Sequence, residues 1–185
     1  MKLRTGLFAL MISLCLLTGC MPSGQADRKV FEKFREGLGE ISMTAKLRAD
    51  YGDAVSDFVL EFAESDDKYR INVLEPALIS GCRVSISKDG ADLEYEGIIL
   101  SVGELSREGM TPVTVLPALV SALREWKLAD IRREGGDTPL LMIELADLDN
   151  MTAVFWLDEK MILKRAELAF EGYTVAYCDI TKWNA

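Results

Sequence analysis

The sequence of 185 residues contains no histidine. This absence excludes His-based catalytic triads, HExxH zinc sites and histidine general bases. Basic side chains are also outnumbered, because 21 Lys and Arg stand against 30 Asp and Glu, for a net charge of −9. Affinity for nucleic acid comes mainly from Lys and Arg at phosphates, so this balance argues against a nucleic-acid partner. No P-loop, dinucleotide fingerprint or serine nucleophile motif is present. We therefore expect no enzyme, no cofactor and no metal centre.

Cysteine is scarce as well, and only Cys82 and Cys178 lie beyond residue 20. Their spacing matches no metal or redox motif. In an exported protein the two thiols could form a disulfide that ties the middle of the sheet to its last strand. The alternative is two free thiols that pack as small hydrophobic side chains. The sequence leaves both alternatives open.

The chain begins with the pattern of an export signal. Lys2 and Arg4 precede an apolar run of eleven residues at positions 7–17, which is too short to span a bilayer. The Leu-Thr-Gly-Cys sequence at residues 17–20 resembles the lipobox of bacterial lipoprotein signals. The resemblance implies cleavage after residue 19 and diacylation of Cys20, and two acyl chains give stable membrane anchoring.

Three segments follow from this reading. Residues 1–19 are the lipoprotein signal peptide, residues 20–26 are a small, polar, lipidated tether, and residues 27–185 are long enough for one folded domain. The lipoprotein resemblance implies an extracytoplasmic protein. Its lipid would hold it at the outer leaflet of the cytoplasmic membrane, or at the outer membrane if the host has two membranes.

Helical and strand periods alternate along the domain. Asp27 is placed to cap a helix that runs to about Gly37. Residues 41–50 then alternate between apolar and polar side chains, which predicts a strand with one wet face. Further hairpins follow, interrupted by one amphipathic helix that starts near Thr114 with Pro117 in its first turn. Ten or eleven strands and two helices predict one strongly curved antiparallel sheet.

The order of helix, long meander, mid-chain helix and final meander resembles the LolA/LolB-like lipoprotein-carrier superfamily. Several short stretches carry the same resemblance, which spans roughly residues 27–183. These stretches are residues 68–73 followed by Pro76, residues 87–90 leading to 93–96, and residues 154–158 followed by 163–165. The resemblance implies an α+β, mostly β fold, a curved antiparallel half-barrel whose concave face is covered by the two helices.

The alternating strands predict an apolar inner face, which the second helix would close. If the inner side chains fall short of one another, a hydrophobic pocket remains, and if they interlock they form an ordinary core. The carrier resemblance implies a pocket for an apolar ligand, such as the acyl chains of lipids or lipoproteins. The candidate ligand-binding residues are Met43, Leu47, Phe58, Leu60, Phe62, Ile71, Val73, Leu116, Leu119, Leu123, Phe155, Leu157, Leu168 and Phe170.

Two functions remain open at this stage. The first is a membrane-anchored lipoprotein that binds a lipid or acyl chains in the half-barrel. The second is a non-enzymatic lipoprotein that binds an envelope protein and regulates or positions an envelope or spore-germination enzyme, a role associated with lipoproteins of this fold. A packed interior and an exposed apolar patch would favour the second function.

Two groups of acidic residues invite chemical interpretations. Asp92, Glu94 and Glu96 share one face of a strand, where paired carboxylates could do acid/base work, although a solvated outer face explains them as well. Asp147, Asp149 and Asn150 could suggest a calcium loop. They lack the glycine and distal glutamate of an EF-hand, so a turn closed by Asp side chains is the better interpretation.

Overall fold

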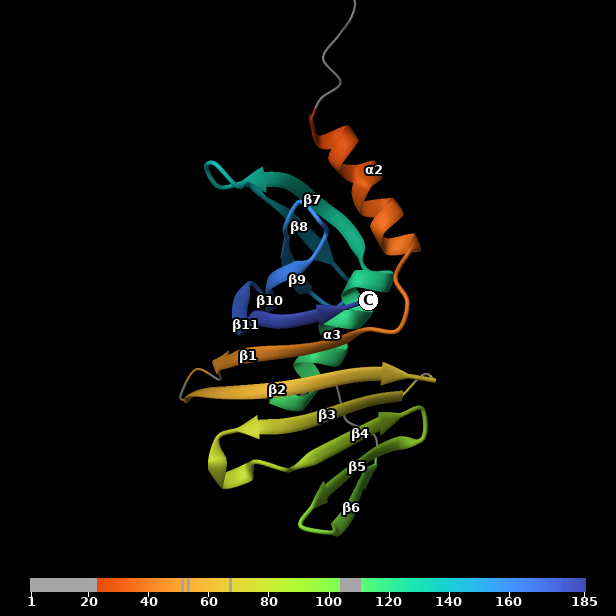
Figure 1. Ribbon diagram of the computed structural model, residues 1–185, viewed down its shortest axis with the longest axis vertical. Coiled ribbons are helices and arrows are strands. Elements are labelled where there is room, and N and C mark those ends of the chain that lie inside the picture. Colours follow the sequence, from red (N-terminus) through yellow and green to blue (C-terminus); the bar gives the residue numbers. More distant parts are fainter. Residues whose placement is uncertain (1–22, 51, 53, 67, 104–110) are drawn as a thin grey trace, which may run out of the picture.

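The computed structural model describes residues 23–50, 52, 54–66, 68–103 and 111–185 (Figure 1). The expected signal peptide, Cys20 and the first residues of the expected tether lie outside the described residues. The elements in chain order are α2 (Ser23–Glu36), β1 (Ser42–Asp50), β2 (Val55–Ser65), β3 (Lys68–Glu75), η1 (Ala77–Ile79), β4 (Arg83–Ser87), β5 (Gly90–Tyr95), β6 (Ile98–Gly103), α3 (Pro112–Glu125), β7 (Lys127–Glu134), β8 (Leu140–Ala146), β9 (Met151–Leu157), β10 (Leu163–Phe170) and β11 (Tyr173–Asn184).

The eleven strands form a single antiparallel sheet in the order β6-β5-β4-β3-β2-β1-β11-β10-β9-β8-β7. Most neighbours in this order are consecutive strands joined by hairpins. Strands β1 and β11 are the exception, because they come from the two ends of the domain. They pair with each other in a register that places Ser42 opposite Asn184. The edges β6 and β7 do not pair with each other, so the curved sheet stays open. The expected fold class, a mostly β half-barrel with two helices, is confirmed.

Helix α3 lies against the inner, concave face of the sheet (Figure 1). It begins at Pro112, two residues before the predicted start. The difference has a local cause, because the backbone N–H of Thr111 donates to the Thr114 hydroxyl at 3.0 Å and caps the helix there. A proline at the first helical position needs no N–H partner. The prediction that Pro117 lies in the first turn is wrong, because the earlier start makes it the sixth residue of the helix.

Helix α2 packs along the edge strand β7 and sends Phe31, which is 1% exposed, into the common core. The prediction that Asp27 caps this helix is wrong. The helix begins at Ser23, so part of the segment expected to be a tether is helical. The Asp27 carboxylate is buried and accepts hydrogen bonds from Arg133 of β7, at 2.9 Å from Nη2. Its side chain joins helix and sheet across more than a hundred residues of sequence.

Among the described residues, no helix is long and apolar enough to cross a membrane.

Candidate functional site

The concavity of the half-barrel is filled by its own helix. Twelve of the fourteen candidate ligand-binding residues are buried in one hydrophobic cluster, and Phe58 packs against that cluster while only partly buried. Phe62 and Phe155, from the two halves of the sheet, and Leu119 of α3 are all at most 2% exposed. The structure therefore brings thirteen of these side chains together, and they are in contact with each other as a packed core.

Phe170 is the exception. It lies at the end of β10, is 44% exposed and is not part of the cluster. The pairing of β10 with β11 shifts register between Leu168 and Ala169. The extra residue of this irregularity is Val175 on β11, whereas β10 pairs with β9 without a shift at this end. Phe170 therefore lies opposite Met151, which packs against the core. Phe170 shares the face of Met151 at the end of the strand, but it stays outside the buried cluster.

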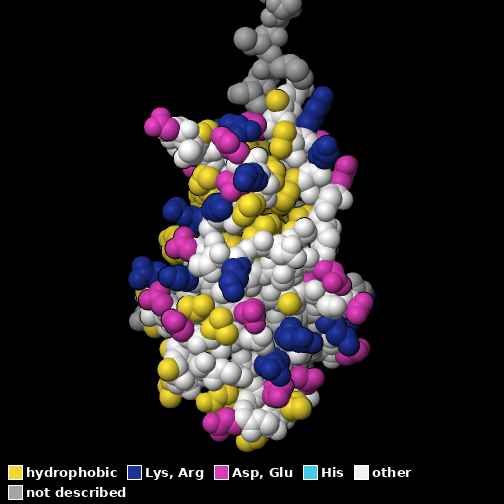
Figure 2. Space-filling view, viewed as in Figure 1, with side chains coloured by type: hydrophobic (Ala, Val, Ile, Leu, Met, Phe, Trp, Pro, Cys, Tyr) yellow, Lys and Arg dark blue, Asp and Glu magenta, His cyan; other side chains and the backbone are white. Residues whose placement is uncertain are grey.

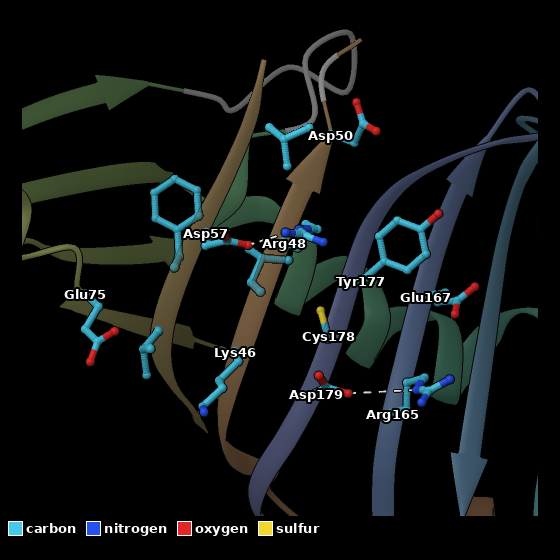
Figure 3. Close-up of a pocket in the computed structure, with 14 residues that line it drawn as sticks. Lys46, Arg48, Asp50, Asp57, Glu75, Arg165, Glu167, Tyr177, Cys178 and Asp179 are labelled. Atoms are coloured by element: carbon cyan, nitrogen blue, oxygen red, sulfur yellow. Dashed lines mark hydrogen bonds and ion pairs between the residues drawn. The ribbon is translucent and has the colours of Figure 1, made fainter. Parts of the chain in front are cut away.

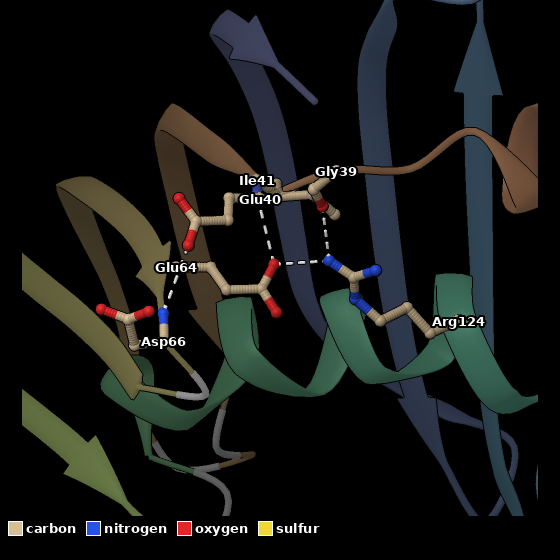
Figure 4. A network of polar contacts seen from close by, with 6 residues as sticks. All are labelled: Gly39, Glu40, Ile41, Glu64, Asp66 and Arg124. Atoms are coloured by element: carbon tan, nitrogen blue, oxygen red, sulfur yellow. Dashed lines mark hydrogen bonds and ion pairs between the residues drawn. The ribbon is translucent and has the colours of Figure 1, made fainter.

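One ion pair holds the C-terminal half of α3 to the sheet (Figure 4). Arg124 Nη2 donates to Glu64 Oε2 at 2.6 Å and to the carbonyl oxygen of Gly39 at 2.7 Å. The same Glu64 oxygen accepts the backbone N–H of Ile41 at 3.2 Å. Glu64 ends up mostly buried, with 13% of its side chain exposed. The sequence contains no signal for this contact, because its partners lie 60 residues apart and Glu64 reads as a turn residue.

A second arginine supports the same end of the helix. Arg35 of α2 donates from Nη2 to the carbonyl oxygen of Trp126, directly after α3, at 3.0 Å. Its guanidinium also lies 4.7 Å from the centre of the Phe31 ring, within cation–π range. Burial lowers the pKa of Arg35. Together, Arg35 and Arg124 tie α2, α3 and the first strands into one unit.

The outer face of the central strands carries a hollow of about 980 Å³ (Figure 3). Its lining is charged. Arg48 pairs with Asp57 at 3.2 Å, and Arg165 approaches Asp179 at 3.8 Å. Glu167 faces the same hollow, and burial raises its pKa against the opposing effect of Arg165. Charges of both signs suit a polar ligand and would be costly to cover with an acyl chain.

Apolar side chains are exposed at the opposite end of the sheet from α2, on the edge strand β6. Ile98, Ile99 and Leu100 are 63%, 64% and 56% exposed. We call these three residues the apolar strip. Next to it, the hydroxyl of Tyr95 donates to the carbonyl oxygen of Leu78 in η1 at 3.3 Å, and Leu78 is itself exposed. Hydrophobic side chains accordingly reach the surface at this end of the molecule (Figure 2).

The sequence already contained a sign of this strip. Most strands of the domain alternate apolar and polar residues, whereas residues 98–100 are apolar without interruption. Such a run predicts a strand that is apolar on both faces. A central position would bury both faces, but the sheet order places this strand at an edge.

Cys82 and Cys178 are both free thiols. Cys82 directly precedes β4, whereas Cys178 lies in β11, and β3, β2 and β1 stand between them. Four strand spacings amount to about 19 Å along the sheet, far beyond the ~7 Å that a disulfide can bridge between Cα atoms. Of the two alternatives, the structure has the free thiols. Burial raises the pKa of Cys178 to about 12.

The acidic residues have structural partners. Glu94 pairs with Arg83 at 3.0 Å and Asp92 accepts the Ser101 hydroxyl at 2.6 Å, on the outer face. Asp147 Oδ1 accepts the backbone N–H of Asp149 at 2.8 Å and of Met151 at 3.0 Å, which confirms the side-chain-closed turn. In the part of the chain that the structure describes, no three His, Cys, Asp or Glu side chains are gathered to hold a metal ion.

One open sheet of eleven antiparallel strands, curved around a helix, is the half-barrel that the sequence resemblance implied. No protein-family model matches the chain, and no curated protein sequence matches it.

Several solved structures are similar to it at low identity. A LolA superfamily protein from Nitrosomonas europaea shares 10% identity over 88% of this chain and 93% of that chain, with a TM-score of 0.46. The lipoprotein LppX of Mycobacterium tuberculosis shares 13% identity over 89% and 97%, with a TM-score of 0.49. A chain in the complex of the CwlD amidase with the GerS lipoprotein from Clostridioides difficile shares 10% over 91% and 99%, with a TM-score of 0.40. At these values no residue role is transferred, and the site is argued from this chain alone.

Proposed function

We propose that this chain is a lipid-anchored, non-enzymatic lipoprotein that binds a partner protein outside the cytoplasm. The observation that carries the proposal is the contrast between its interior and its edge. The concave face, where a carrier would hold its ligand, is occupied by α3, with Leu116 and Leu119 at 0% and 2% exposure. The apolar strip, by contrast, remains in water. Exposed apolar surface of this kind commonly marks an interaction site.

The anchor supports the same assignment. Acylation at Cys20 would fix the chain at a membrane just before α2 begins at Ser23. Helix α2 and strand β6 lie at opposite ends of the long axis of the molecule (Figure 1). An anchored chain would therefore present the apolar strip away from its own membrane, where proteins of the envelope can reach it. We infer that the partner is an envelope enzyme, which the domain positions or regulates, with spore germination as one setting for such a pair.

The proposal is tested on the full, lipidated chain purified from its host in mild detergent. We expect a second protein at a fixed stoichiometry close to one per chain, measured by size-exclusion chromatography with light scattering. A chain that elutes alone under all detergent and salt conditions, and that contains bound lipid other than its anchor, contradicts the proposal.

A second function is favoured by one observation. The buried side of α3 and the inner face of the sheet are both apolar, so displacement of α3 would open a continuous apolar surface. An acyl chain could then be bound, at about 25 cal/mol per Å² of buried apolar surface. This function predicts that the Glu64→Gln variant, which weakens the Arg124 contact, takes up a fluorescent fatty acid more readily than the wild-type chain. The protein-binding function predicts no saturable uptake by either chain.

A further inference from the structure

Among the described residues, strand β6 forms one edge of the sheet and pairs with β5 alone. Proteins usually protect such an edge with charged residues, proline or a bulge, because its free N–H and C=O groups can pair with another chain. The sequence of β6, Ile-Ile-Leu-Ser-Val-Gly, contains no charge and no proline. The one irregularity in its pairing lies between Ala91 and Asp92, beyond the apolar strip. The segment Ile98–Leu100 is thus a regular, unprotected edge.

The inner face of this edge continues the hydrophobic core. Phe62, Ile71, Val84, Leu93 and Leu100 lie opposite one another on five successive strands. The first three are buried and Leu93 is partly buried, whereas Leu100 is 56% exposed. The row of core side chains therefore ends in solvent at β6. A strand added beside β6 would extend both the backbone ladder and this apolar row.

The outer face of the same hairpin is acidic. Residues 90–103 contain Asp92, Glu94 and Glu96 and no Lys or Arg. Glu94 lies opposite Ile99 and Asp92 lies opposite Ser101, so two carboxylates border β6 on the face away from the core. Opposite charges on neighbouring strands stabilise their pairing, and like charges oppose it. A strand docked beside β6 would lie two strands from these carboxylates, so long Lys or Arg side chains are the ones that reach them across β6. Glu94 already pairs with Arg83, so Asp92 is the main attraction.

We propose that β6 is the docking edge for an extended segment of the partner protein, one that alternates apolar residues with Lys or Arg. The apolar residues would continue the row that ends at Leu100, and the long basic side chains would lie opposite Ile99 and Ser101 and reach across β6 toward Asp92. This inference rests on the proposed function, because it names how and by what chemistry the partner binds.

The same observations argue against two other occupants. In a two-fold pairing of β6 with a second copy, Asp92 and Glu94 of both chains would lie on one face without basic partners from the added strand. Such a pair would also place its two α2 helices at opposite ends, which does not suit two anchors in one membrane. A lipid surface is disfavoured because β6 lies far from the end that carries the anchor (Figure 1).

The test selects binders for the full lipidated chain, in detergent micelles, from a displayed library of random peptides of about ten residues, the upper range of strand lengths. We expect enrichment of peptides that alternate apolar and basic residues. Leu100→Lys and Ile99→Lys should each weaken the best peptide by about tenfold or more in Kd, which corresponds to 1.4 kcal/mol. Leu148→Lys, which changes a leucine that is 88% exposed in a distant turn, is the matched control and should leave Kd within about twofold.

Two further readouts make the mode of binding specific. Hydrogen exchange should slow at the amides of β6 when the peptide binds. Replacement of the Lys residues of the peptide by Glu should abolish binding. Because both variants alter exposed side chains, their urea midpoints should match that of the wild-type chain. A variant that unfolds earlier is replaced by the other one, which lies on the opposite face of the strand.

Three results would overturn the inference. The first is a library that yields no peptide sensitive to the β6 variants. The second is a dimer in light scattering that Leu100→Lys dissociates, which would make a second copy the occupant. The third is binding to vesicles of anionic phospholipid that Leu100→Lys abolishes. If instead a stoichiometric partner binds but ignores both β6 variants, the docking edge is wrong while the protein-binding function stands. A bound lipid in the same preparation counts against that function itself.

Discussion

Arg124 on α3 and Glu64 on β2 meet at 2.6 Å at the rim of the half-barrel, and this contact fixes the helix in the concavity. The pair is only partly exposed, with 30% and 13% of the two side chains in solvent. It also orders the start of β1, because Glu64 accepts the N–H of Ile41 and Arg124 binds the carbonyl of Gly39. One carboxylate thus connects the helix, β2 and the segment that leads into the sheet (Figure 4).

Removal of this carboxylate should destabilise the domain. Glu64→Ala leaves Arg124 with the Gly39 carbonyl but without its carboxylate, and it leaves the Ile41 N–H without this acceptor in a partly buried place. The loss costs about 1–3 kcal/mol in the free energy of unfolding. Urea denaturation measures this cost. Asp57→Ala is the matched control on the same strand, since its ion pair with Arg48 is more than half exposed on both sides and should change stability by at most about 0.5 kcal/mol. Equal effects of the two substitutions would refute a special role for Glu64.

The packed interior makes its own prediction at Leu119. Truncation in Leu119→Ala should reduce the free energy of unfolding by about 2–5 kcal/mol, because the helix and sheet cannot collapse fully into the space left behind. Leu148→Ala, at a leucine that is 88% exposed, should stay within about 0.5 kcal/mol. A loss below about 1 kcal/mol at Leu119 would mean that this side of α3 is not closely packed.

The buried thiol of Cys178 predicts both a reactivity and a pH dependence. Burial raises its pKa to about 12 from 9.0, so the folded chain keeps a neutral thiol where the unfolded chain ionises. Its contribution to stability is complete below pH 9 and is lost as pH rises toward 12. In Cys82→Ser, a thiol-specific disulfide reagent should react with native chain only as fast as the chain unfolds. If the folded variant at pH 8 reacts rapidly with one equivalent of this reagent, Cys178 is accessible.

A half-buried pair, Glu134 with Trp156, predicts an effect at low pH. The hydrogen bonds from the Trp156 indole, at 3.0 Å, and from Arg132 lower the pKa of Glu134. Because the pKa is lower in the folded state, the ionised carboxylate stabilises the fold at pH values above the ordinary pKa. This stabilisation is lost as pH falls through the pKa of the folded state. The Trp156 indole N–H resonance should therefore keep its bonded shift to a pH below the usual range of Glu. In Glu134→Gln the same resonance should not titrate over that range.

The sequence predicted the elements whose causes are local. Strand β1 fills the predicted stretch 41–50 except for its first residue, and α3 forms where the amphipathic helix was predicted. Alternation and helical spacing are visible in a short window. The pairing of β1 with β11 is a contact between the two ends of the domain, and no local pattern encodes it.

The candidate site was harder to predict. The inner face could be assigned for thirteen residues, but periodicity says nothing about whether their volumes fill the concavity. The structure answers that question for the described residues, with Leu119 and Phe155 in the same closely packed cluster. Contacts such as Arg124 with Glu64, or Asp27 with Arg133, depend on where distant segments meet, so they follow from the fold and not from a motif.

The central claim is that the half-barrel holds its own helix and not a lipid. Native mass spectrometry of the chain from Met21 onward, without the anchor and followed by organic extraction, tests this claim directly. We predict the mass of the protein alone, an empty extract and no saturable uptake of a fluorescent acyl probe. A co-purified lipid of defined mass, at about one molecule per chain in a site of the size that holds such ligands, would contradict the account and identify the chain as a carrier.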